Sequence, residues 1–81
     1  MRITTRFFAI LRERAGTNEL LLDLRDGARV SDALEALSAR LSSVRDFLPR
    51  VACAINQQYA SVDAELHDGD ELALIPPVSG G

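Results

Sequence analysis

The C-terminal end is the part of this chain whose residue types could take part in chemistry. The chain ends in Gly80-Gly81, shortly after the pair Pro76-Pro77. Glycine lacks a Cβ atom, so such an end can pass through a narrow partner site, and a Pro-Pro stem is stiff and extended. A carboxylate must be activated, most simply as an acyl adenylate, before a sulfur or amine nucleophile attacks it. The tail suggests an activated carboxylate, with a frayed terminus as the alternative.

The side chains that usually form catalytic or metal sites are not combined in a known pattern. Cys53 falls in an apolar segment, so we expect its small side chain to be buried. His67 falls in a polar turn, so we expect its side chain to be solvated. One Cys and one His make no metal cluster, the acids of 63–71 lack the spacing of a calcium loop, and no glycine-rich phosphate motif occurs. We therefore expect no metal, no bound cofactor and no catalysis by this chain alone.

Composition narrows the classes of partner. The chain has 81 residues, enough for one small domain, and 47% of them are hydrophobic. Its net charge of −3 argues against a nucleic-acid partner, since proteins that bind nucleic acids normally carry a basic surplus.

The sequence also bears on location. No apolar run approaches the ~20 residues of a membrane helix, and no signal peptide is evident. A single Cys fits a cytoplasmic location. All nine basic residues are Arg, so only the α-amino group could act as an internal amine nucleophile.

Hydrophobic periodicity predicts the elements of the first half. Alternation over 3–11 predicts a half-buried strand, followed by a turn over 12–18 and a second strand over 20–24, which would form a hairpin with the first. An apolar stripe at helical spacing predicts an amphipathic helix with Ser31 as its N-cap. The stripe consists of Val30, Ala33, Leu34, Leu37 and Leu41.

The second half predicts further strands around the helix. We expect a strand over 51–55, a turn at Asn56-Gln57, an irregular stretch with at most one short strand, a tight turn over 68–70 and a strand over 71–75. This order predicts an α+β, β-grasp (ubiquitin-like) domain over 1–75. Its mixed four- to five-stranded sheet would have one main helix on one face and the first and last strands side by side in the middle. Residues 76–81 would form a flexible, extended tail.

Three apolar residues are predicted to lie outside the core. By strand parity Phe8 shares a face with polar residues, Ile75 lies opposite the buried leucines of the last strand, and Tyr59 follows a polar turn. If the first and last strands are neighbours, Phe8 and Ile75 meet at the root of the tail. Exposed aromatic and aliphatic side chains in one patch suggest a partner surface, with scattered exposure as the alternative.

Three segments resemble a known family. They are residues 7–16 (FFAILRERAG), 54–57 (AINQ) and 68–81 (DGDELALIPPVSGG), and their order and spacing span nearly the whole chain. Together they resemble the small, sulfur-carrier subunits of molybdopterin synthase, which are ubiquitin-like β-grasp proteins. The last segment is far more specific than Gly-Gly alone, whereas the helix matches only in pattern.

The resemblance implies a mechanism. An ATP-dependent, E1-like activating enzyme would adenylate the carboxylate of Gly81, and sulfur would replace one oxygen to give a thiocarboxylate. The tail would then enter a pocket of the large synthase subunit, where the sulfur attacks a cyclic pyranopterin precursor. Two successive transfers would build the dithiolene of molybdopterin. The catalytic side chains, including an essential lysine, would belong to the large subunit.

The resemblance also implies roles for individual residues. Gly81 would carry the sulfur and Gly80 would give slack and clearance. The inserted stem would consist of Pro76, Pro77, Val78 and Ser79. Hydrophobic partner contacts would be made by Phe8, Tyr59 and Ile75, although the family often has Leu and Phe at the last two of these positions.

Other functions of the same tail stay open at this point. The chain could carry sulfur for another pathway, such as cysteine, thiamine or thiolated tRNA, although thiamine carriers are usually shorter and lack the Pro-Pro-Val-Ser stem. It could also be a ubiquitin-like modifier joined to target lysines, or a β-grasp adaptor without tail chemistry.

Overall fold

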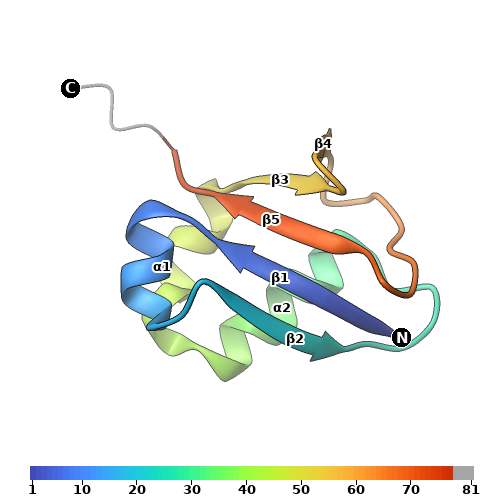
Figure 1. The fold of residues 1–81 in the computed structure, drawn as a ribbon, viewed down its shortest axis with the longest axis horizontal. Helices are drawn as coiled ribbons and strands as arrows, with labels where there is room; N and C mark the ends of the chain where they lie inside the picture. Colours follow the sequence, from blue (N-terminus) through green and yellow to red (C-terminus); the bar gives the residue numbers. More distant parts are fainter. Residues whose placement is uncertain (78–81) are drawn as a thin grey trace.

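A five-stranded mixed sheet forms the centre of the structure, a computed structural model that describes residues 1–77 (Figure 1). The strand order is β2-β1-β5-β3-β4. The strands are β1 (Arg2–Phe7), β2 (Glu19–Asp23), β3 (Ala52–Ile55), β4 (Gln58–Ala60) and β5 (Glu71–Ile75). The central neighbours β1 and β5 are parallel and the other pairs are antiparallel. The predicted β-grasp arrangement, with the first and last strands side by side, is confirmed.

Helical segments cover one face and one end of this sheet (Figure 1). They are α1 (Ala9–Ala15), α2 (Val30–Arg40) and the 3₁₀ segment η1 (Ser42–Arg50). The main helix α2 lies across the back of the sheet in this view, and α1 lies at the end where β1 and β5 finish. Within residues 1–77, no helix is both long and apolar enough to cross a membrane.

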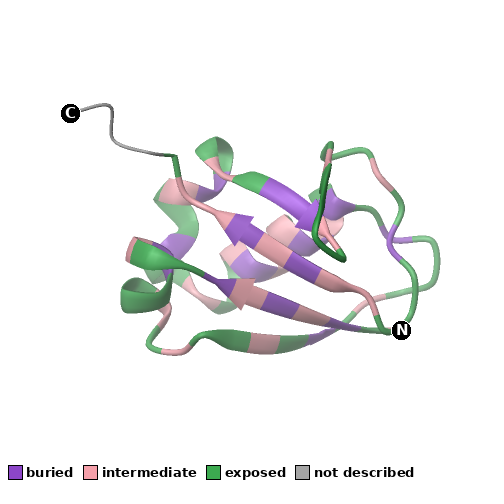
Figure 2. Ribbon diagram, turned by 45° about the horizontal axis from the view of Figure 1, so that its top comes forward, coloured by how far each residue is buried: buried purple, intermediate pink, exposed green. Residues whose placement is uncertain are grey.

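Strand alternation decides which face of the sheet is buried (Figure 2). Ile3, Thr5 and Phe7 of β1 point inward with Leu72 and Leu74 of β5, and all five are at most 1% exposed. The intervening residues of both strands are exposed or half-buried. The core is completed by Leu11, Leu22, Val30, Ala33, Leu37, Val44, Leu48, Cys53 and Leu66. The predicted helix stripe is confirmed, since Leu34 and Leu41 pack against this core.

The prediction for residues 8–15 is wrong, whereas the expected turn is present at 16–18. The strand ends at Phe7 rather than Leu11, and Ala9–Ala15 forms a helix where the end of the strand and the start of the turn were expected. Leu11 is four residues after Phe7, so the same apolar pair fits a helix as well as a strand, and it is buried in the helix. Gly16 ends α1 with a φ of 78°, which is the left-handed conformation that glycine adopts most readily. Strands β1 and β2 pair as predicted, but a helix joins them.

The start of α2 also differs from its prediction. Arg29, not Ser31, is the N-cap residue, and its backbone N–H donates to Asp32 Oδ2 at 2.8 Å. The helix therefore begins before Ser31. Asp32 still lies in the first turn, where the helix dipole favours an acid.

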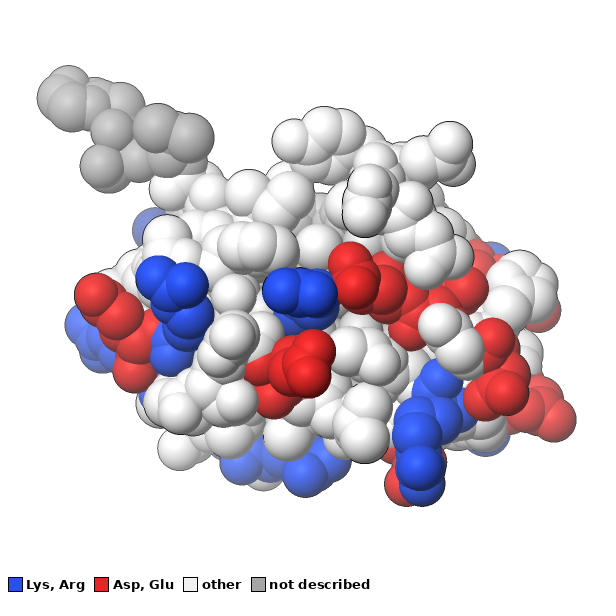
Figure 3. All heavy atoms as spheres, in the orientation of Figure 1, with Lys and Arg blue, Asp and Glu red and all other residues white. Residues whose placement is uncertain are grey.

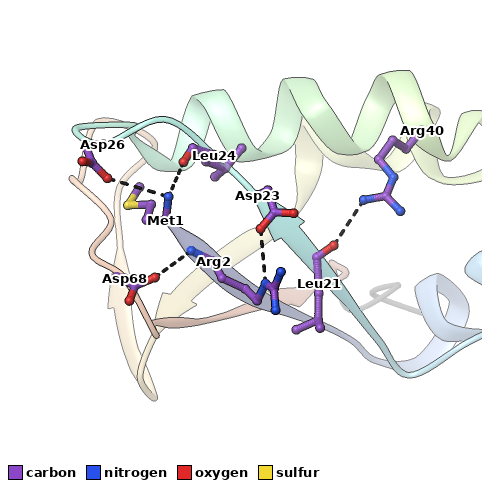
Figure 4. A network of polar contacts seen from close by, with 8 residues as sticks. All are labelled: Met1, Arg2, Leu21, Asp23, Leu24, Asp26, Arg40 and Asp68. Carbon is purple, nitrogen blue, oxygen red and sulfur yellow. Dashed lines mark hydrogen bonds and ion pairs between the residues drawn. The ribbon is translucent and has the colours of Figure 1, made fainter.

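Polar contacts hold both sides of the central strand β1 at its N-terminal end (Figure 4). The Met1 ammonium donates to Leu24 O at 2.7 Å, and the Arg2 backbone N–H donates to Asp68 Oδ1 at 2.8 Å. At the edge of the sheet, Arg40 Nη1 of α2 donates to Leu21 O of β2 at 3.2 Å. The Met1 and Arg2 contacts tie the start of β1 to the end of β2 on one side and to the turn before β5 on the other, and the Arg40 contact ties α2 to β2.

The turn before β5 is organised by Asp70. Its side chain is 13% exposed and accepts hydrogen bonds from His67 N at 2.8 Å and from Asn56 Nδ2 at 2.9 Å. Asn56 Oδ1 in turn accepts a bond from Glu71 N at 3.0 Å. The tight turn expected over 68–70 therefore ends at one largely buried carboxylate, which joins the β3–β4 turn to the start of β5.

We predict that Asp70→Ala lowers the free energy of unfolding by about 1–3 kcal/mol, because two donors lose a charged acceptor. Urea unfolding measures this loss. The matched control is Asp63→Ala, since the Asp63 side chain forms no hydrogen bond or ion pair within residues 1–77, and it should change stability by no more than ~0.5 kcal/mol. Equal stability of the two variants would contradict the role given to Asp70.

Candidate functional site

The face of the sheet away from α2 carries a row of side chains set by strand register. Arg6 of β1 lies beside Ala73 of β5, Ala73 lies opposite Ala54 of β3, and Ala54 lies opposite Tyr59 of β4. Because alanine side chains are small, Ala73 and Ala54 leave a shallow surface between the larger side chains of Arg6 and Tyr59. This surface is called the alanine floor below. The turn at Asn56-Gln57, which was predicted, brings β4 back so that Tyr59 stands at the edge of this floor.

Phe8 lies at the junction between β1 and α1. It keeps extended backbone angles as the N-cap residue of α1, and Ala9 after it has a φ of 51°. This left-handed residue turns the chain sharply, which leaves the Phe8 side chain 41% exposed. Phe8 is thus exposed as predicted, but for a different reason: it lies in the turn after the strand, not on its polar face.

Two adjacent grooves meet at Phe8 and Ile75. The first, here called the sheet groove, has a volume of about 690 Å³. It lies over the alanine floor and is lined by Arg6, Phe8, Ala54, Gln57, Tyr59, Glu71, Ala73 and Ile75. The second, here called the stem groove, has a volume of about 820 Å³ and lies between α1, η1 and the end of β5. It is lined by Phe8, Ala9, Ile10, Phe47, Arg50, Ile75, Pro76 and Pro77.

Apolar side chains dominate this surface. Tyr59 is 79% exposed, Phe8 is 41% exposed and Ile75 is half-buried. Arg6 and Glu71 form an ion pair of 3.6 Å beside the alanine floor, so the sheet groove contains a balanced charge pair. Figure 3 shows uncharged side chains along the upper part of the view, where β5 ends, whereas acidic side chains gather toward the end where β5 starts. The surface can therefore bury apolar area against a partner.

The structure brings together five of the residues expected to contact a partner. Phe8, Ile75, Pro76 and Pro77 line the stem groove, and Tyr59 joins Phe8 and Ile75 in the sheet groove. The other four expected site residues, Val78, Ser79, Gly80 and Gly81, lie outside the described residues.

Several residues that line the two grooves were not predicted from the sequence. Ala54 and Ala73 form the floor, and their only signal is small size on the outward side of paired strands. Phe47 and Arg50 come from η1, which the sequence pattern did not predict as an element, so nothing linked them to Phe8.

The remaining reactive side chains lie elsewhere. Cys53 is 5% exposed on the inner face of β3, and burial raises the pKa of its thiol. His67 is exposed and lies 3.8 Å from Asp70 through its Nδ1 atom. In the part of the chain that the structure describes, no three His, Cys, Asp or Glu side chains are grouped so that they could hold a metal ion. Chemistry on this chain is therefore not assigned to Cys53 or His67.

Sequence relatives match the chain from end to end. A molybdopterin synthase sulfur carrier subunit from Chlamydomonas reinhardtii is 42% identical over 83 residues, covering 100% of both chains. A protein of the same name from Mycobacterium tuberculosis is 32% identical and covers 100% of this chain and 99% of its own.

A solved structure shows the same fold. The crystal structure of small archaeal modifier protein 1 (SAMP1) from Haloferax volcanii superposes with a TM-score of 0.89 at 34% identity and covers 100% of both chains. The order of strands and helices described above is thus that of a ubiquitin-like β-grasp protein. A family model described as the ThiS family matches residues 5–81, so the match runs from the central strand through both grooves to the C-terminal glycines. With near-complete coverage by the family model and full-length relatives above 30% identity, the chain belongs to the ThiS family.

Proposed function

We propose that this chain is the sulfur carrier subunit of a molybdopterin synthase. The observation that carries the proposal is the end-to-end match to proteins of that name, which includes the Gly80-Gly81 terminus. The apolar surface at the root of the tail supports it, because a carrier must bind the proteins that load and unload it. An adaptor without tail chemistry would not need this combination.

The chemistry takes place at the carboxylate of Gly81. An E1-like enzyme joins this carboxylate to AMP from ATP and releases pyrophosphate. A sulfur nucleophile then attacks the acyl carbon and AMP leaves, which gives a thiocarboxylate. In the large subunit the thiocarboxylate sulfur attacks a carbon of the cyclic pyranopterin precursor and takes the place of an oxygen substituent, which leaves. Water then hydrolyses the bond between sulfur and the Gly81 acyl carbon, so that the sulfur stays on the precursor and the Gly81 carboxylate is restored. Two such transfers build the dithiolene.

In this proposal the folded domain binds the large subunit and directs the tail toward the partner's pocket. Phe8, Tyr59 and Ile75 form the apolar contact with the large subunit, and the low floor of Ala54 and Ala73 lets a partner side chain approach the sheet. The stem of Pro76, Pro77, Val78 and Ser79 then leads from this contact into the partner's pocket. Because the rings of Pro76 and Pro77 fix φ, these two residues lose little entropy when the tail is inserted.

The direct test is the intact mass of the chain after expression with its activating enzyme. Replacement of one C-terminal oxygen by sulfur would support the proposal. The alternative function is that of a protein modifier, which the likeness to SAMP1 suggests. In that case the chain would be found joined covalently to other proteins instead. A plain carboxylate, despite an active enzyme and a sulfur donor, would overturn the carrier function.

Deletion of Gly81 is predicted to abolish sulfur transfer. The new terminal carboxylate would be set back by one residue, roughly 3.5 Å, so it would not reach the reacting position. Dithiolene formation in a purified synthase assay measures the effect. Thermal unfolding is the control and should be unchanged, because the core lies within residues 1–77. Retained transfer would contradict the role of Gly81.

Phe8→Arg is predicted to weaken binding to the large subunit by at least about tenfold, because the change places an unpaired charge in an apolar contact. Isothermal titration calorimetry gives the Kd. Val62→Arg is the matched control, since Val62 is 49% exposed and lines neither groove. If both variants bind like the wild type, Phe8 is not at the interface.

Cys53→Ala is predicted to leave sulfur transfer intact while lowering stability by about 1 kcal/mol, because a buried sulfur atom is removed. Because burial raises the pKa of the thiol, little thiolate forms near neutral pH, and iodoacetamide should label folded Cys53 far more slowly than unfolded Cys53. A large loss of transfer by a folded variant would instead indicate a thiol function.

A further inference from the structure

The stem groove differs in charge from the sheet groove beside it. The sheet groove contains the ion pair between Arg6 and Glu71, whereas Arg50 is the one charged residue among residues 1–77 that lines the stem groove. The guanidinium of Arg14 also lies 5.5 Å from the ring centroid of Phe47, which is part of the same lining. An apolar groove is thus bordered by cationic groups on its α1 and η1 sides.

Arg50 is weakly held by the rest of the chain. It is the last residue of η1, and within the described part of the chain its side chain forms one long hydrogen bond, from Nη2 to Asp46 O at 3.5 Å. Among residues 1–77 it takes part in no ion pair, although five ion pairs occur there. Its donors are therefore available to a partner carboxylate, for which the guanidinium fork is well suited.

The position of the groove indicates what covers it. Pro76 and Pro77 form part of its wall, so a protein that encloses the residues after Pro77 must also lie over the groove. Phe8 and Ile75 belong to both grooves, so the two are continuous. Burying a guanidinium under apolar partner atoms is unfavourable unless a carboxylate pairs with it.

The distribution of charge along the chain favours an acidic partner surface over α1 and η1. α1 and η1 carry four Arg against two acids, whereas the rest of the chain carries five Arg against ten acids. A partner with carboxylates over α1 and η1 would be attracted here and repelled by the acidic remainder, which favours one orientation of docking.

We propose that the stem groove is a second docking surface for the large synthase subunit, and that it receives an apolar side chain with a carboxylate beside it, which pairs with Arg50. This inference rests on the proposed function, because it takes the large subunit as the protein that receives the tail. It adds a charged recognition element to the apolar contact of Phe8, Tyr59 and Ile75.

The test is the Kd of the chain for the large subunit, measured by calorimetry at low and high salt. Arg50→Glu should raise the Kd at least about tenfold and weaken its salt dependence. Ile10→Gln should raise the Kd several-fold, because Ile10 lines only the stem groove and is not part of the core cluster. Thermal unfolding checks that both variants fold, and Arg50→Gln replaces Arg50→Glu if the latter does not.

Two matched controls separate this groove from general effects. Arg25→Glu makes the same change in net charge at an exposed position outside both grooves, and Val62→Gln makes a similar polar change there. Both should bind within about twofold of the wild type. The inference is overturned if Arg50→Glu also binds within this range, or if Arg25→Glu loses as much affinity. A wild-type chain that does not bind the large subunit would overturn the proposed function, and the inference with it.

Discussion

The parallel pairing of β1 with β5 is the constraint on which the rest of the structure depends. The two strands come from opposite ends of the chain, and their register places Phe7 beside Leu74. The inward residues of both strands then form the centre of the core, and the outward residues form the floor and walls of the sheet groove. A shift by one residue would exchange these faces, so the same register decides both stability and the binding surface.

Contacts at the two ends of this strand pair have different consequences. At the beginning of β5, Asp70 and Asp68 satisfy backbone donors of the neighbouring turn and of Arg2, which fixes where the strand starts. At the other end no comparable polar network is present in residues 1–77. There Phe8, Ile75 and the two prolines lie together, with apolar groups facing solvent. Hydrogen bonds thus close one end of the pair, while the other end presents apolar side chains to a partner.

In the proposed function the chemistry belongs to the terminal carboxylate rather than to a side chain of the domain. The one Cys is buried in the core, His67 belongs to a turn, and the chain has no Lys. A carrier needs a tail that other proteins can act on and a surface by which they recognise it. In the proposed function Ile75 links the two, because it lines both grooves and the tail follows it directly in the sequence. The groups that activate the tail and transfer the sulfur belong to the partner proteins.

The sequence by itself determined the amphipathic helix, the strands that become β2, β3 and β5, and the turns at Asn56-Gln57 and 68–70. These follow from local periodicity and turn chemistry, which each segment carries alone. Only the tertiary structure decided that residues 9–15 form a helix, because Phe7 and Leu11 fit both periods until the core selects one. It also decided that Arg50 and Phe47 lie beside Phe8, and that two alanines form a groove floor. Such neighbours are set by strand register and by η1, whose contacts join residues far apart in the chain.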